Sequence, residues 1–109
     1  HYGCGGVKAA LDGLDKISGL PSLHEWLGEV GKVADVLEPN LSPEARWRRG
    51  VEESVLFQLG NLPTYAKVKG AMAASKLSLH GWVYDIHTSE LSVYDAGKDA
   101  FVRASSLLR

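Results

Sequence analysis

The stretch LSLHGWVYDI, residues 77–86, places the strongest constraint on what this chain can fold into. It is rich in β-branched and aromatic residues and nearly apolar on both faces, which is typical of a central strand covered on two sides. The tetrapeptide HTSE then makes a turn, and residues 91–94 can return as a second, antiparallel strand. A two-stranded hairpin is marginal alone, so the sequence predicts a sheet with more strands than it supplies itself.

Helical patterns occupy the part of the chain before this hairpin. VKAALDGLDKI predicts a helix of about two turns that ends near Gly13. A second helix begins at Pro21 and stops before Pro39, because apolar residues between them recur every three or four positions. These residues are Leu23, Trp26, Leu27, Val30, Val33, Ala34 and Leu37. The first half of the chain is therefore predicted to be helical.

Three more helices are expected further along. One begins near Ser42 and presents an apolar stripe made of Val51, Val55, Leu59 and Leu62. TYAKVKGAMAASK, residues 64–76, continues as a shorter helix after a break at Pro63. The last helix is predicted from about Lys98 to Leu108, after the hairpin. The order is several helices, a hairpin and a final helix.

Composition excludes some classes of protein. The 109 residues are 45% hydrophobic and 23% charged, as in ordinary globular domains, and the formal net charge is -1, so no strong field draws the chain to nucleic acid or an anionic membrane. The cluster Arg46, Arg48 and Arg49 is interpreted as the solvated face of a helix rather than a phosphate site. No apolar stretch approaches the roughly 20 residues that span a bilayer. We expect a soluble protein in a reducing compartment, such as the cytoplasm or an organelle matrix, since its single cysteine excludes an internal disulfide framework.

The first eleven residues, HYGCGGVKAAL, carry the clearest chemical signal. His1 and Cys4 stand three positions apart in a glycine-rich turn that leads into a helix. Imidazole and thiolate at this spacing can both reach one zinc ion, so the pair can form half of a metal site. Cys4 can equally be a nucleophile at a helix N-terminus, where the macrodipole favours the thiolate, or an ordinary buried cysteine beside a surface histidine. From the spacing alone these alternatives stay open.

Three separated segments together resemble the C-terminal half of the β-class carbonic anhydrases. They are HYGCGGVKAAL, VLFQLGNLPTYAKVKGAM and LSLHGWVYDIHTSELSVYD, in this order, and the resemblance covers nearly the whole chain. In that family the H-x-x-C turn supplies two of three protein ligands to a catalytic zinc ion, which the resemblance maps onto His1 and Cys4. The amide of Gly5 corresponds to a position where bicarbonate is hydrogen-bonded. The resemblance thus implies zinc-dependent, reversible hydration of carbon dioxide to bicarbonate.

Parts of the family pattern are missing from these 109 residues. The C-x-D-x-R motif, which in the family brings the third ligand and an Asp–Arg pair, has no counterpart here. We therefore expect residues 1–109 to be a partial β-carbonic anhydrase domain whose upstream half is absent, and we expect this piece to be inactive alone. Ser89 also stands where the family usually has glycine, which puts the conformation of that turn in question.

The resemblance also implies a fold and an assembly. The fold is α/β, with the C-terminal part of a mostly parallel sheet, flanking helices and a terminal antiparallel strand. Members form homodimers or larger homo-oligomers, and carbon dioxide and bicarbonate are the expected small-molecule partners. Two other functions stay open: a non-catalytic oligomerisation or interaction remnant of the same fold, and a metal-free enzyme that uses Cys4 as nucleophile. The remaining histidines, His24, His80 and His87, are interpreted as structural or solvent-facing.

Overall fold

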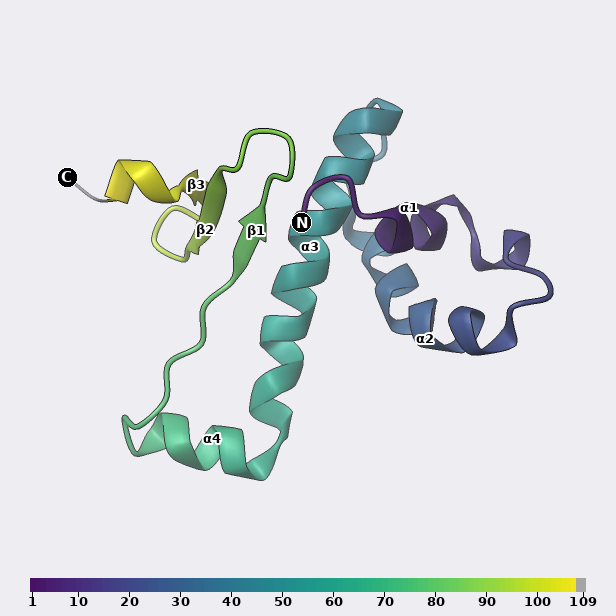
Figure 1. Ribbon diagram of the computed structural model, residues 1–109. Helices are drawn as coiled ribbons and strands as arrows, with labels where there is room; N and C mark the ends of the chain where they lie inside the picture. The colour runs from purple at the N-terminus through teal and green to yellow at the C-terminus, as the bar shows by residue number, and fades with distance from the viewer. Residues whose placement is uncertain (108–109) are drawn as a thin grey trace. The chain divides into compact units, whose positions relative to one another are not determined.

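The computed structural model describes residues 1–107, which form two compact units. Figure 1 labels the main helices and strands along the chain. The first unit is His1–Ser54, and the second begins at Val55. The boundary falls inside the long helix α3, Pro43–Asn61. Each unit is described separately below.

The first unit is helical. It contains α1 (Gly5–Asp12), a short 3-10 turn η1 (Leu14–Lys16), α2 (Pro21–Gly31), a second 3-10 turn η2 (Lys32–Val36) and the first part of α3. Local chemistry explains the ends: Gly13 takes φ +116°, a conformation that L side chains rarely adopt, and α1 stops there. The amide of Ala45 donates to Ser42 Oγ over 3.2 Å, which caps the start of α3. The three helices predicted here are confirmed, although the second ends as a 3-10 turn.

A small apolar core holds this unit together. Its buried side chains are Tyr2, Val7, Ala10, Leu27, Val33, Leu37 and Val51. The helices α1 and α3 approach closely at Gly50, where an added Cβ would lie 2.5 Å from Leu11 Cδ1 and 3.3 Å from Val7 Cγ1. The α1 helix therefore lies on α3 at a point where only a glycine fits without rearrangement.

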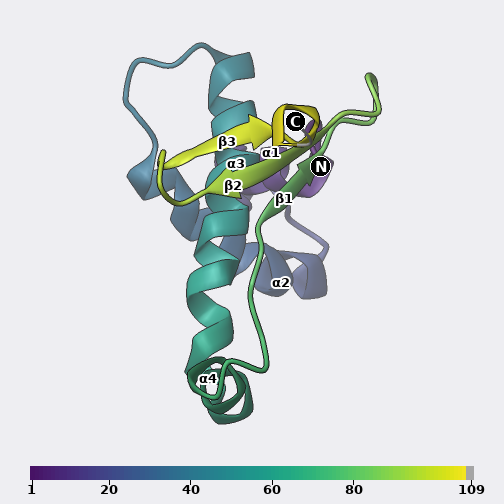
Figure 2. The same ribbon diagram turned by 90° about the vertical axis from the view of Figure 1, so that its left-hand side faces the viewer.

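The second unit combines the end of α3 with a 3-10 turn η3 (Leu62–Thr64), helix α4 (Ala66–Ala73) and three strands. The strands are β1 (Trp82–Tyr84), β2 (Leu91–Asp95) and β3 (Ala100–Arg103), followed by a 3-10 turn η4 (Ala104–Leu107). They form one antiparallel sheet in the order β1-β2-β3 (Figure 2). Gly81 lies against α3, because an added Cβ would sit 2.9 Å from Leu59 Cδ1 and 3.0 Å from Val55 Cγ1.

The turn between β1 and β2 contains the residue that departs from the family pattern. Ser89 has φ +59°, in the left-handed region that favours glycine. The Asp85 carboxylate supports this turn by accepting hydrogen bonds from the amides of His87 (2.9 Å) and Thr88 (3.2 Å). The turn thus keeps a glycine-like conformation with a serine in place.

Several predictions about this unit are wrong. The strand predicted over residues 77–86 is confined to Trp82–Tyr84 and is not buried on both faces: Val83 is fully buried, but Trp82 is 59% exposed and Tyr84 45% exposed. Successive side chains of a strand point to opposite faces of the sheet, so Val83 lies on a covered face of β1, and Trp82 and Tyr84 lie on an open one. The predicted partner strand at 91–94 is confirmed as β2.

The helix predicted from Lys98 to Leu108 is also wrong within the described residues, and Leu108 lies outside them. Residues 100–103 are instead strand β3, because the preceding Asp95 and Asp99 build a hairpin turn. Asp95 Oδ1 accepts from the Gly97 amide over 2.9 Å, and Asp99 takes φ +49°. This turn chemistry outweighs the helical tendency of the segment. The mostly parallel sheet implied by the family is likewise not seen in residues 1–107, where every strand pair is antiparallel.

Candidate metal centre

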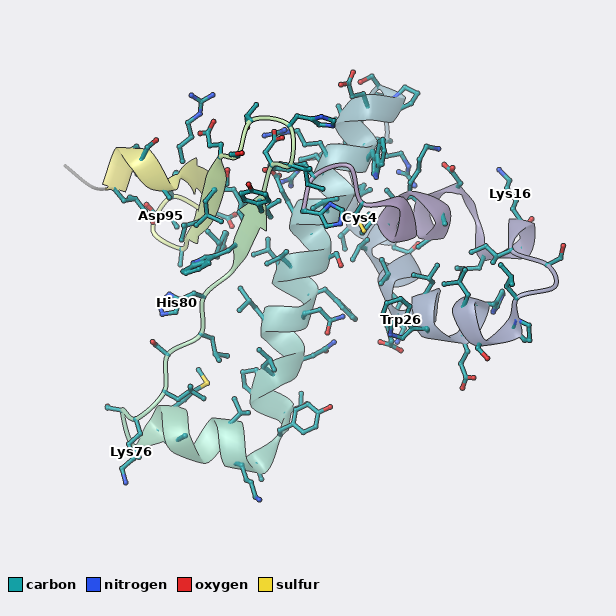
Figure 3. The ribbon with its side chains drawn as sticks, in the orientation of Figure 1. Cys4, Lys16, Trp26, Lys76, His80 and Asp95 are labelled. Atoms are coloured by element: carbon teal, nitrogen blue, oxygen red, sulfur yellow. The ribbon has the colours of Figure 1, made fainter. Side chains whose placement is uncertain are left out.

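The two candidate zinc ligands lie on one tight turn at the start of the first unit. Tyr2 and Gly3 form the turn, and Gly3 has φ +74°, a conformation that favours glycine. Cys4 is the residue before α1, with extended φ and ψ of -65° and 115° (Figure 3). The H-x-x-C spacing therefore corresponds to a real change in chain direction, as the sequence predicted.

The His1 ring is exposed, and its Nδ1 lies 3.0 Å from the Tyr2 carbonyl oxygen. A carbonyl oxygen can only accept a hydrogen bond, so Nδ1 carries the hydrogen in this contact. The lone pair of the neutral ring is then on Nε2. Metal-binding histidines commonly have this arrangement, in which the second ring nitrogen donates to a carbonyl or carboxylate.

Cys4 is half-buried and not part of a disulfide. Its carbonyl accepts the first backbone hydrogen bond of α1, from Lys8 at 3.1 Å. Gly5 begins the helix, so its amide is one of those that an α-helix leaves without an intrahelical acceptor. Apart from its chain neighbours, an added Cβ at Gly5 would meet no atom within 4 Å, so the space around Gly5 is open.

Side chains from α3 hold this turn. The Trp47 Nε1 donates to the Cys4 carbonyl over 2.8 Å. The Tyr2 hydroxyl donates to Glu52 Oε1 over 2.6 Å, and the Arg48 guanidinium lies over the Tyr2 ring, with Cζ 3.7 Å from the ring centroid. Tyr2, one of the two residues between the candidate ligands, and Cys4 itself are therefore both anchored.

The Glu52 carboxylate is in turn held by Arg49. Arg49 Nη1 donates to Glu52 Oε2 over 2.8 Å, and its Nη2 donates to Glu53 Oε1 over 2.9 Å. Glu38 adds a longer ion pair of 3.7 Å with Arg49 Nε. The hydrogen bond with Glu52, helped by these other carboxylates, raises the pKa of the Arg49 guanidinium above its ordinary value. The arginine cluster is thus only partly the solvated face that the sequence predicted.

The donor set fits zinc in its chemistry but supplies half of a site. Thiolate and imidazole are the ligands that zinc prefers, and three protein donors are usual in a catalytic site. Within residues 1–107 no three His, Cys, Asp or Glu side chains cluster closely enough to hold a metal ion. His24, His80 and His87 are exposed, as predicted, and His80 pairs with Ser78 Oγ at 2.9 Å. The ligand role of His1 and Cys4 therefore stays a prediction.

Sequence reasoning did not find Tyr2, Trp47 or Glu52. Trp47 and Glu52 are 43 and 50 positions from the turn residues that they bind. No local pattern signals such pairs, although a tyrosine placed between two candidate ligands and a tryptophan within an arginine cluster were available clues.

Among the described residues, no helix is both long and apolar enough to cross a membrane.

The chain is similar in sequence to proteins of known family. A family model for carbonic anhydrase matches residues 1–91. Carbonic anhydrase 1 of Escherichia coli O157:H7 is 29% identical over 104 residues, and a carbonic anhydrase of Pseudomonas aeruginosa is 34% identical over 106 residues. Each match covers 94% of this chain and 47% of the relative.

Comparison of the fold with solved structures indicates the same family. A solved structure described as the β-carbonic anhydrase CcaA superposes with a TM-score of 0.76 at 32% sequence identity, over 94% of this chain and 48% of that one. The chain thus spans about half the length of the relatives that it matches. Because the family model covers most of the residues, and the solved structure agrees in both fold and sequence, the chain belongs to the carbonic anhydrase family, in its β class.

Proposed function

We propose that the protein containing this chain is a zinc-dependent carbonic anhydrase that interconverts carbon dioxide and bicarbonate. The observation that carries the proposal is the coincidence of the family match with the built turn at residues 1–4, in which an imidazole and a thiol lie at the start of α1. Both the reaction and the metal are inferred from the family.

Three residues of this chain have roles in the proposal. His1, through Nε2, and Cys4, through Sγ, would hold the metal. Zinc supplies, when bound, the positive charge that makes hydroxide available near neutral pH. The Gly5 amide, at the N-terminus of α1, would donate a hydrogen bond to the bicarbonate anion, and the helix dipole favours negative charge there.

The rest of the site is expected from residues outside this chain. The family resemblance assigns to an upstream segment the third ligand and the Asp–Arg pair that controls the fourth coordination position. The same segment would supply the parallel strands of the sheet. By this proposal residues 1–109 alone bind zinc weakly and do not hydrate carbon dioxide, and the complete protein is a homodimer or larger homo-oligomer.

The central test is metal analysis and carbon dioxide hydration of the full-length protein. We expect one zinc ion per chain and enzymatic hydration, and we expect Cys4→Ser to remove most of both, because a hydroxyl is a poor substitute for a thiolate. His1→Asn should behave in the same way. His24→Asn, on the exposed surface of α2, is the matched control and should retain zinc and activity.

The alternative functions give different results in the same test. Zinc without hydration would favour a non-catalytic remnant of the fold. An active protein without metal would favour Cys4 as a nucleophile. Unchanged zinc content in purified Cys4→Ser would refute its role as a ligand.

A further inference from the structure

The contacts between α3 and the turn at residues 1–4 form a connected set. We propose that Tyr2, Trp47 and Glu52 are positioning residues for the zinc site, which hold the turn in its metal-binding shape before the metal arrives. The inference rests on the proposed function. It goes beyond that function because it assigns a metal-related role to side chains that are not themselves ligands.

Tyr2 is the centre of this set because its two polar ends act on different partners. Its carbonyl oxygen accepts from His1 Nδ1 over 3.0 Å, which directs Nε2 away from the backbone. Its hydroxyl donates to Glu52 Oε1 over 2.6 Å, and its side chain is buried. The orientation of the candidate imidazole ligand is thus connected through one residue to a fixed point on α3.

Cys4 is held at its own main chain. The Trp47 indole donates to the Cys4 carbonyl, which already accepts the first hydrogen bond of α1. A carbonyl oxygen has two lone pairs and can satisfy both donors. The indole therefore fixes the peptide plane next to the candidate thiolate without removing the helix hydrogen bond.

Glu52 is itself kept in place, so it can act as an anchor. Its second carboxylate oxygen accepts from Arg49, and only 13% of the Glu52 side chain is exposed. The Arg48 guanidinium covers the Tyr2 ring from another side. The hydrogen bond between Arg49 and Glu52 joins two charged groups, and such charge-assisted hydrogen bonds are shorter and stronger than neutral ones.

Preorganisation gives these contacts a function beyond packing. Two donors on a free turn would lose backbone and side-chain freedom when they bind a metal, and that loss weakens affinity. A turn that is already fixed loses less. The hydrogen bonds from α3 end on the candidate ligand Cys4 and on Tyr2, one of the two residues between the candidate ligands, while the apolar side chains of α1 pack on α3 at Gly50.

The test uses the full-length protein and measures zinc affinity by chelator competition, together with the visible absorption of the cobalt-substituted protein. We expect Tyr2→Phe, which keeps the ring and removes the hydroxyl, and Trp47→Phe to weaken zinc binding on the order of 10-fold, as the loss of outer-shell partners of metal ligands commonly does. The cobalt bands should shift or change in intensity, because the ligand geometry changes. Tyr65→Phe and Trp26→Phe are matched controls at exposed positions and should match the wild type.

Glu52 provides a partial rescue. Glu52→Gln keeps an oxygen that can accept from Tyr2 but loses the oxygen that accepts from Arg49, so it should retain more zinc affinity than Glu52→Leu, which should lose it as Tyr2→Phe does. Thermal unfolding of each metal-free variant separates a positioning role from a purely structural one. The inference is overturned if Tyr2→Phe and Trp47→Phe lower the unfolding midpoint but leave zinc affinity within about twofold and the cobalt spectrum unchanged. A wild-type protein that binds no zinc would instead refute the proposed function.

Discussion

The two units of the chain differ in how they use their apolar residues. Seven of the eight buried apolar side chains among residues 1–107 lie in His1–Ser54, and only Val83 lies in the second unit. In the same described residues, eleven large hydrophobic side chains are exposed, and eight of them lie in the second unit. The first unit therefore surrounds a core, whereas the second presents much of its apolar surface.

This difference follows from the secondary structure of each unit. An amphipathic helix buries a stripe against a neighbouring helix, as α1, α2 and α3 do in the first unit. A strand has two faces, and only one face of β1 is covered. Trp82 and Tyr84 lie on the open face and stay exposed, while Val83 between them is buried. At this length the helices cover one another's apolar side chains, whereas the three strands leave much of theirs exposed.

The largest expected effect is in the core of the first unit. Leu27→Ala should lower the free energy of unfolding by about 2–5 kcal/mol, because Leu27 is 3% exposed and its removal leaves a cavity. Chemical denaturation measures the change. Trp26→Ala, on the same helix but 76% exposed, is the control and should change stability by no more than about 0.5 kcal/mol. Equal losses in the two variants would contradict the assignment of the core.

The second unit should respond most strongly at Gly81. Gly81→Ala should destabilise the protein by about 1–3 kcal/mol, since the new Cβ would collide with Leu59 and Val55. Gly70→Ala is the control, because it lies within α4 with no atom within 4 Å of an added Cβ, and it should stabilise by about 0.5–1 kcal/mol. Thermal unfolding of both variants checks the opposite signs. A stabilising Gly81→Ala would show that the end of α3 does not pack on this segment.

A smaller effect of opposite sign is expected at the turn between β1 and β2. Ser89→Gly should stabilise the protein by up to about 1 kcal/mol, because glycine adopts φ +59° without steric cost. Ser92→Gly, within β2, should instead destabilise by about 0.5–1 kcal/mol. Denaturation midpoints of the two variants distinguish a turn effect from a general effect of glycine. A loss of stability in Ser89→Gly would contradict the strained conformation.

The smallest effect concerns the surface of α1. The hydrogen bond from Lys8 lowers the pKa of the Asp12 carboxyl below its ordinary value of 3.8. Because the folded-state pKa is the lower one, the stabilisation is present above the ordinary value and is lost as the pH falls through the folded-state pKa. An NMR titration of the Asp12 carboxyl should show the lowered pKa and its return toward 3.8 in Lys8→Met. The shift should also shrink at high salt, since the pair is exposed. An identical titration in the variant would exclude Lys8 as the cause.

The helices of the first unit and the turn that carries the candidate ligands could be predicted from the sequence alone. Helical hydrogen bonds join residues four apart, so the apolar spacing up to Pro39 and the prolines at positions 21 and 43 were enough to place α2 and the start of α3. The H-x-x-C segment also predicted a turn before α1, and in the structure Gly3 takes φ +74° within that turn.

The exposure of β1 and the anchoring of the turn at residues 1–4 depend on tertiary contacts. Whether Trp82 is covered depends on what packs on its face of the sheet, and the pairing of Phe101 and Val102 with Tyr94 and Val93 adds to the local turn chemistry that makes residues 100–103 a strand. The bonds from Tyr2 to Glu52 and from Trp47 to Cys4 join residues 50 and 43 positions apart. Contacts over such separations depend on how α1 packs on α3, and no local pattern of residues encodes that packing.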